Sequence, residues 1–453
     1  MRPPVEAPLD IAELIAKRIA SQYTAGEALL SEVKAWRLVS RAFADAFEPY
    51  LFSHGSFTDA SSYNVARTAR RADTLIGILS KRPSIGSRVK HFDIYLSGSY
   101  THPLLPLILE RLEQVEDLSV NGSGSKAGRV EWNALSEELR EALLRLALRP
   151  RVRALRMEYI QFFPATVILK SYGLTKLGLS GSSVRYTEDM EDAVSRTSPW
   201  AVFDLDISCA NAESIRGWLS RLDHPGTLLG GLRSLTTKHL GRDDPHINAI
   251  ISLCGEYSPS LESLDITLHR NEEREFFHSR VWLVHTEAKP RPPDAHVIRS
   301  VALAPLKTLK TLHITFVKPS TYGAMLSEFI EDLAQSFNQM ETACLEDFRL
   351  TFNGIDELPL LPTNLLHMLH HFNPILQAKA QQTNGPGAIT RLKRFTLDFS
   401  VDVLAGNSMW RSRLERLDEE QLLFPMLGRE RVRLRVVDER TQDILFESRS
   451  SDT

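Results

Sequence analysis

Apolar side chains recur in a six-residue frame along most of this chain, with polar or charged residues between them. In 261–266 the apolar residues occupy positions one, four and six. The frame recurs at ten places, and the residues at its first, fourth and sixth positions are Val89/Phe92/Ile94, Val115/Leu118/Val120, Val152/Leu155/Met157, Leu174/Leu177/Leu179, Val202/Leu205/Ile207, Leu232/Leu235 with Thr237 sixth, Leu261/Leu264/Ile266, Leu309/Leu312/Ile314, Leu345/Phe348/Leu350 and Leu392/Phe395/Leu397. Apolar fourth and sixth positions around a polar fifth have the two-residue period of a short strand with one buried face. The pattern therefore predicts ten short strands.

Segments with helical periodicity lie between these predicted strands. They cover 131–148, 211–222, 244–256, 321–337 and 362–382, and a further helix over 64–82 precedes the first frame. One strand and one helix cannot cover their own apolar faces, so neighbouring copies must stack to form a continuous core. The alternation favours parallel strands on one face and helices on the other.

The frame resembles the opening of a leucine-rich repeat, L-x-x-L-x-L. That family places Asn or Cys three positions further on, but the equivalent positions here hold Ala210, His269, Val317, Asn353 and Ser400. Because a single copy complies, the resemblance implies an irregular solenoid without a regular asparagine ladder. We therefore expect an α/β fold of the leucine-rich-repeat-like solenoid type over residues 53–446. Residues 447–453, rich in serine and charge, are expected to form a disordered tail.

Two amphipathic helices are predicted before the solenoid, in residues 1–52. The first covers 8–20 and places four apolar residues on one face, namely Ile11, Leu14, Ile15 and Ile19. The second carries a stripe of large apolar residues, namely Trp36, Val39, Phe43 and Phe47, and Pro49 is expected to end or bend it. About fifty residues bury little core alone, so these helices need the first repeats or a partner to cover them.

The same segment resembles the F-box, and in particular the F-box-like openings of fungal repeat proteins. The resemblance is carried by three short motifs, Pro8-x-Asp10-Ile11-x-x-Leu14-Ile15, Leu38-Val39-Ser40-Arg41-x-Phe43 and Pro49-Tyr50-Leu51-Phe52. The family's first leucine is Ala7 here, and its glutamate is Asp10. An F-box binds the Skp-type adaptor of a cullin–RING ubiquitin ligase. The residues that the resemblance assigns to this contact are Pro8, Ile11, Leu14, Ile15, Trp36, Leu38 and Val39.

The resemblance implies a substrate receptor of a ubiquitin ligase of this type. The N-terminal helices would dock the adaptor, the solenoid would hold an as yet unknown target protein, and the chain itself would make or break no bond. The alternative is a non-catalytic repeat scaffold without a ubiquitin connection, in which the helices only cap the first repeat. Exposure distinguishes the two, since an adaptor site leaves Ile11, Ile15 or Leu38 partly uncovered in the isolated chain.

Composition and charge narrow the classes of partner that can be expected. The chain has 453 residues, of which 43% are hydrophobic and 25% charged, and its 54 basic and 57 acidic residues give a net charge of −3. This balance produces no general attraction to nucleic acid or to an anionic membrane, so neither is expected as a partner. Cys209, Cys254 and Cys344 lack metal-binding spacing, and no apolar run resembles a signal peptide or a membrane span. We expect a cytoplasmic or nuclear protein.

Motifs for catalysis are weak. The glycines of 122–128 fit neither a phosphate-binding loop nor the dinucleotide fingerprint, and a flexible connection is the simpler interpretation. His367 and His371 lie one helical turn apart, but Met368 stands where a zinc protease has its glutamate, and no third ligand is evident. The sequence therefore predicts a protein that is not an enzyme and that needs no cofactor or metal.

Overall fold

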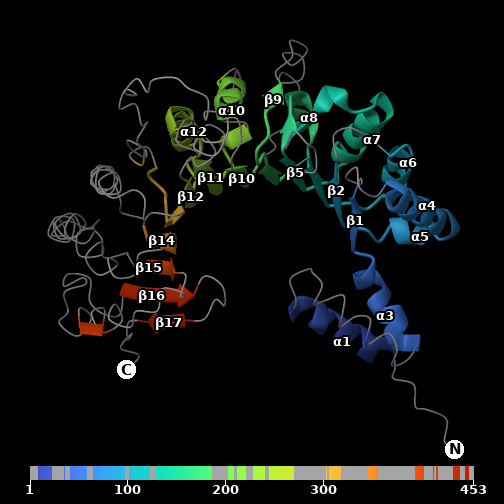
Figure 1. The fold of residues 1–453 in the computed structure, drawn as a ribbon, viewed down its shortest axis with the longest axis horizontal. Coiled ribbons are helices and arrows are strands. Elements are labelled where there is room, and N and C mark those ends of the chain that lie inside the picture. Colours follow the sequence, from blue (N-terminus) through green and yellow to red (C-terminus); the bar gives the residue numbers. More distant parts are fainter. Residues whose placement is uncertain are drawn as a thin grey trace, which may run out of the picture. The chain divides into compact units, whose positions relative to one another are not determined.

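The computed structural model describes residues 9–22, 35, 41–58, 65–96, 102–122, 129–185, 202–208, 212–220, 228–239, 244–269, 303, 306–317, 345–355, 393–401, 412, 415–416, 432–438 and 444–447. The chain divides into two compact units, Met1–Ser198 and Pro199–Thr453. Figure 1 labels helices and strands of both units. The predicted helices over 321–337 and 362–382 and the tail after Glu447 lie outside the described residues.

In the first unit, five parallel strands pair in chain order. They are β1 (His54–Thr58), β2 (His91–Tyr95), β3 (Asp117–Asn121), β5 (Ala154–Glu158) and β8 (Lys176–Gly178). The helices are α1 (Leu9–Gln22), α3 (Arg41–Leu51), α4 (Val65–Lys81), α5 (Pro83–Gly86), α6 (Leu105–Glu110), α7 (Glu137–Ala147) and α8 (Ala165–Lys170). Two small parallel pairs join β4 (Val130–Glu131) to β6 (Ile160–Gln161) and β7 (Phe163–Pro164) to β9 (Val184–Arg185).

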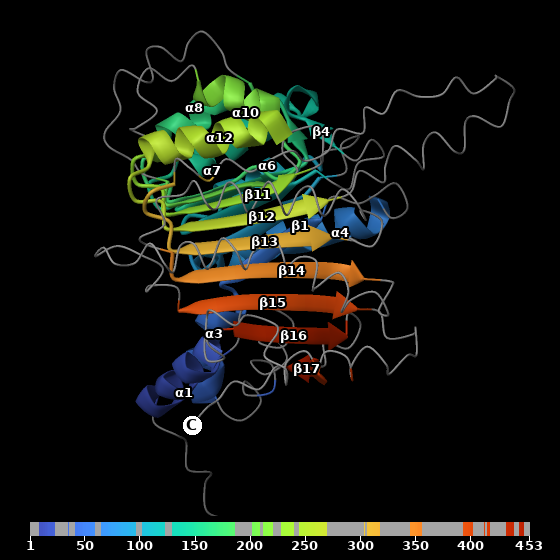
Figure 2. The ribbon, with the colours of Figure 1, turned by 90° about the vertical axis from the view of Figure 1, so that its left-hand side faces the viewer.

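The second unit contains seven parallel strands in chain order and one antiparallel strand, most of which are labelled in Figure 2. The parallel strands are β10 (Asp204–Ser208), β11 (Ser234–His239), β12 (Ser263–His269), β13 (Thr311–Val317), β14 (Asp347–Ile355), β15 (Arg394–Val401) and β16 (Val432–Asp438). Strand β17 (Ile444–Glu447) pairs antiparallel with β16. Helices α10 (Ala212–Leu219) and α12 (Asp244–Tyr257) connect the first strands of this unit.

The six-residue frame is the repeating element of the large parallel sheet in both units. In the second unit its fourth positions pair directly, so Leu264, Leu312, Phe348 and Phe395 lie side by side, all at most 1% exposed. The frame's second position also has a constant role, since its carbonyl accepts two backbone N–H groups of the next copy. The carbonyl of Glu262, for example, accepts from Lys310 and Thr311 at 2.8 and 2.9 Å. All ten predicted strands are present, and the predicted α/β fold with a large parallel sheet, consistent with a leucine-rich-repeat-like solenoid, is confirmed.

Some predicted helix boundaries were wrong. Helix α3 continues past Pro49 to Leu51. The missing N–H of Pro49 falls in the helix's last turn, where few further hydrogen bonds depend on it. The helix predicted over 131–148 begins at Glu137 instead, because Ser136 caps it: the N–H of Leu139 donates to the Ser136 hydroxyl at 3.3 Å.

Candidate functional site

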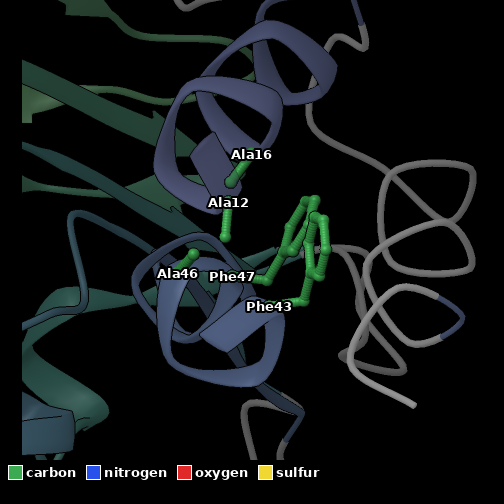
Figure 3. Close-up of a cluster of buried hydrophobic side chains, with 5 residues drawn as sticks. All are labelled: Ala12, Ala16, Phe43, Ala46 and Phe47. Carbon is green, nitrogen blue, oxygen red and sulfur yellow. The ribbon is translucent and has the colours of Figure 1, made fainter. Parts of the chain in front are cut away.

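Helices α1 and α3 pack against each other through small residues on one side and aromatic rings on the other (Figure 3). Ala12 and Ala16 of α1 and Ala46 of α3 are buried together with Phe43 and Phe47, whose rings stack with centroids 6.3 Å apart. The two alanines lie one turn apart, so they form a flat strip that lets α3 approach closely. This contact therefore forms a small hydrophobic core from the helices themselves.

Two large apolar residues of α1 lie outside this core. Ile11 is 49% and Leu14 68% exposed, whereas Ile15 is half-buried at the margin of the helix–helix core. We call Ile11 and Leu14 the outer stripe. Of the other residues that the F-box resemblance assigns to the adaptor contact, Pro8, Trp36, Leu38 and Val39 lie outside the described residues.

The packing of α1 differs from the simplest expectation from its sequence. Hydrophobicity alone favours Ile11 and Leu14 as part of the face that packs on the protein, but Ala12 and Ala16 occupy that face, with Ile15 at its margin. The available signal was the i, i+4 spacing of two small residues, opposite aromatic side chains four apart in the next helix. Helix α3 is linked to the first repeat by an ion pair between Glu48 and Arg88.

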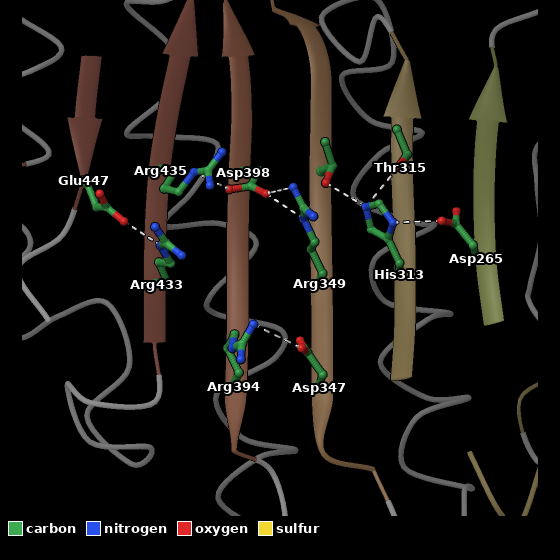
Figure 4. A network of polar contacts seen from close by, with 11 residues as sticks. Asp265, His313, Thr315, Asp347, Arg349, Arg394, Asp398, Arg433, Arg435 and Glu447 are labelled. Atoms are coloured by element: carbon green, nitrogen blue, oxygen red, sulfur yellow. Dashed lines mark hydrogen bonds and ion pairs between the residues drawn. The ribbon is translucent and has the colours of Figure 1, made fainter. Parts of the chain in front are cut away.

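The second candidate surface is the open face of the sheet, formed by the residues at frame positions three and five and by the residue that directly follows each frame. Figure 4 shows this face on β12–β17. Nδ1 of His313 lies 3.0 Å from a carboxylate oxygen of Asp265, and the hydroxyls of Thr351 and Thr315 lie 2.9 and 3.2 Å from Nε2. With the proton on Nδ1, the imidazole donates to Asp265 and the lone pair of Nε2 accepts from one of the two hydroxyls, so both ring nitrogens are satisfied.

Arginines dominate the same face further along the sheet. The buried carboxylate of Asp398 on β15 accepts from Nε of Arg349 on β14 at 2.6 Å and lies 3.3 Å from Nε of Arg435 on β16. This second contact is an ion pair outside hydrogen-bond geometry. Two further pairs extend the network, Arg394 with Asp347 at 3.6 Å and Arg433 with Glu447 at 2.5 Å. The arrangement supplies donors and charges for binding, and no group of side chains in the described residues could hold a metal ion.

The open face of the first unit carries two histidine–aspartate contacts between neighbouring strands. Nε2 of His54 lies 2.9 Å from Asp93, and Nδ1 of His91 lies 3.7 Å from Asp117. The side-chain contact with Asp117 raises the pKa of His91, although partial burial opposes it. Burial of Asp117 would raise the pKa of its carboxyl, but the contact with His91 and the charge of Arg156 outweigh it and lower that pKa.

This pair predicts a pH dependence of stability. The raised pKa of His91 means that its contribution is complete below the ordinary histidine pKa of about 6.5 and is lost as the pH rises through the folded value. Asp117 contributes above its ordinary pKa, and this is lost as the pH falls through its lowered value. When the pH rises from about 5.5 to about 8.5, the free energy of unfolding of the unmodified chain should fall by about 0.2–1 kcal/mol more than that of the His91→Gln variant. This magnitude is typical of partly exposed ion pairs. Urea titrations of both proteins measure this, and equal pH profiles would contradict it.

Other sequence candidates carry no site in the described residues. Cys254 is fully buried, and burial raises the pKa of its thiol to about 12, so it is not a reactive nucleophile. Cys209, Cys344, His367 and His371 lie outside the described residues, as does 123–128 of the glycine-rich segment. None of the helices in the described part is long and apolar enough to cross a membrane.

Comparison with known proteins adds no evidence about function. No protein-family model and no curated protein matches the sequence. Among solved structures, the chain is similar to one in the crystal structure of the Rad7 and Elc1 complex in yeast. The sequences are 14% identical, the match covers 85% of this chain and 97% of that chain, and the TM-score is 0.32.

Proposed function

We propose that this chain is a non-catalytic receptor of a cullin–RING ubiquitin ligase. Residues 1–52 bind a Skp-type adaptor through α1, and the solenoid of residues 53–446 holds a target protein. The observation that carries the proposal is the arrangement of α1, which packs alanines against α3 and exposes Ile11 and Leu14. A helix that already has its core contact and still presents an apolar stripe is suited to a partner's groove.

The open face supports the second half of the proposal. Its hydroxyls, carboxylates and guanidinium groups stand on strands whose other face is fully packed, so the scaffold holds them without rearrangement. Acting as a receptor requires only that one partner be held close to another, because tethering raises the effective concentration of the target near the ligase. No bond chemistry is assigned to this chain.

The proposal predicts that one substitution in the outer stripe weakens adaptor binding. Leu14→Asp should weaken binding of a purified Skp-type adaptor by about tenfold or more, because a charge then replaces an apolar contact residue. Lys17→Asp, also exposed on α1, is the matched control and should bind as the unmodified chain does. Isothermal titration calorimetry measures the affinities, and circular dichroism checks that the helices persist.

Two results would contradict the adaptor assignment. The first is an unmodified chain that does not bind the adaptor, and the second is equal binding by the Leu14→Asp and Lys17→Asp variants. In either case the repeat scaffold without a ubiquitin connection becomes the better description of the chain.

A further inference from the structure

Strand β1 forms an edge of the sheet in the first unit, since β2 is its only partner among the strands that the structure describes. The carbonyl of Ser53 accepts the N–H of His91 at 2.9 Å, which fixes the side to which each backbone group of β1 points. Backbone groups of successive strand residues point to alternate sides, so those of Gly55 and Phe57 face β2. Those of His54, Ser56 and Thr58 face outward, and none of them bonds to another residue that the structure describes.

A groove of about 680 Å³ runs between this edge and helix α4. It is lined by residues 56–58 of β1 and by Arg70, Arg71, Thr74, Leu75 and Ile78 of α4. We call it the β1 groove. Ser56 and Thr58, whose backbone groups face outward, are exposed and line the groove, so the outward side of β1 borders it.

The side chains of the β1 groove combine apolar surface with positive charge. Ile78 is 41% exposed and Leu75 half-buried. Arg70 and Arg71 are exposed, and neither guanidinium forms an ion pair with a residue in the described part of the chain. Apolar residues alternating with acidic ones in an extended segment would match both features.

The edge itself specifies the shape of the ligand. Outward N–H and C=O groups on every second residue are satisfied by another strand and not by a helix, whose own backbone groups are already bonded. Residues 54–58 also lack the features that usually protect an edge, since they contain no proline and no lysine. At the C-terminal end of the second unit's sheet, by contrast, an added antiparallel strand, β17, covers β16.

We infer that β1 is a docking site for an extended, acidic segment of a partner protein. The segment adds to the sheet as a further strand beside β1. Its carboxylates meet Arg70 and Arg71, and its apolar side chains cover Leu75 and Ile78. The inference does not depend on adaptor binding, because it uses neither α1 nor the outer stripe.

A random library of displayed peptides of about ten residues, selected on the full chain, provides the probe. The selected peptides should alternate acidic with apolar residues. The best peptide, synthesised with a fluorescent label, should bind Arg70→Glu/Arg71→Glu about tenfold or more weakly. Lys81→Glu/Arg82→Glu, which reverses two exposed charges outside the groove, is the matched control and should bind normally.

Ser56→Pro tests the backbone contact. The N–H of Ser56 faces outward, so proline removes a group that the peptide needs without breaking the ladder to β2. Fluorescence anisotropy should show about a tenfold loss of affinity or more, while thermal unfolding confirms that the unit remains folded. N-methylation of alternate residues in the peptide tests the same bonds from the other side, because one of the two methylated sets should bind and the other should not.

Three outcomes would overturn the inference. They are a library that yields no binder, selected peptides without acidic residues, and binding that is unchanged by Ser56→Pro and by peptide methylation. Self-association of the chain in sedimentation experiments, abolished by Ser56→Pro, would also overturn it, since the edge would then pair with a second copy.

Discussion

Replacing Phe348 by alanine is expected to lower the free energy of unfolding by about 3–5 kcal/mol. Phe348 is completely buried at the fourth frame position of β14, beside Leu312 and with its ring centroid 5.1 Å from that of Phe395. Alanine would leave a cavity between two strands whose backbones are held by the ladder, so the surrounding structure can relax only in part. Urea titration followed by circular dichroism measures the loss.

The effect of Phe348→Ala should also be local. In a repeat protein each repeat contacts only its neighbours. Hydrogen exchange should therefore become faster in β13–β15 and stay unchanged in the first unit. Lys393→Ala, whose side chain is 72% exposed beside the same strands, is the control and should change stability by no more than about 0.5 kcal/mol. Similar losses from both substitutions would show that Phe348 does not belong to a tightly packed core.

A second row of phenylalanines could be expected from the frame, but the way in which their rings stack could not. Phe316, Phe352 and Phe399 stand two residues beyond the sixth frame position on three successive strands. Their rings stack at centroid distances of 4.8 and 5.1 Å with nearly parallel planes. The sequence predicts that such residues face the core, whereas the stacking requires the register of the strands, which the sequence alone does not provide.

Strand β1 was not predicted from the sequence, and the structure explains why. Phe52, Gly55 and Phe57 follow the spacing of the frame, but a glycine occupies its fourth position. A Cβ on residue 55 would lie 2.9 Å from the ring of Phe92 on the next strand, because this ring fills the space beside the glycine. A pattern search that requires an apolar side chain cannot find a position that is filled by a neighbour.

The polar network of the open face was not predicted from the sequence either. Asp265, His313 and Thr351 lie 38 and 48 residues apart along the chain and meet only because three parallel strands align them. At the level of sequence, each reads as an ordinary solvent-facing residue between two apolar ones. Residue periodicity therefore identified the scaffold and its buried face, while the chemistry of the open face depended on contacts across strands.

The triad of Arg349, Asp398 and Arg435 leads to the other large expected effect. Asp398→Ala removes a buried carboxylate that neutralises two guanidinium groups, and removing one partner of a fully buried pair costs about 3–5 kcal/mol. Because the arginine side chains are 44% and 27% exposed, they can turn toward water, and we expect a smaller loss of about 1–3 kcal/mol. Chemical denaturation of the purified variant measures this value.

Replacing all three residues of the triad tests whether folding requires their charges. The variant Arg349→Met/Asp398→Leu/Arg435→Met removes all three charges together, so no buried group is left unpaired, and it should be at least as stable as the unmodified chain. Light scattering must show that its oligomeric state equals that of the unmodified chain, since the change enlarges the apolar part of the open face. If the triple variant were less stable than Asp398→Ala, the charges would be holding the strands together. Equal or greater stability than the unmodified chain would mean that folding does not require them, which supports the open face as a surface kept for binding.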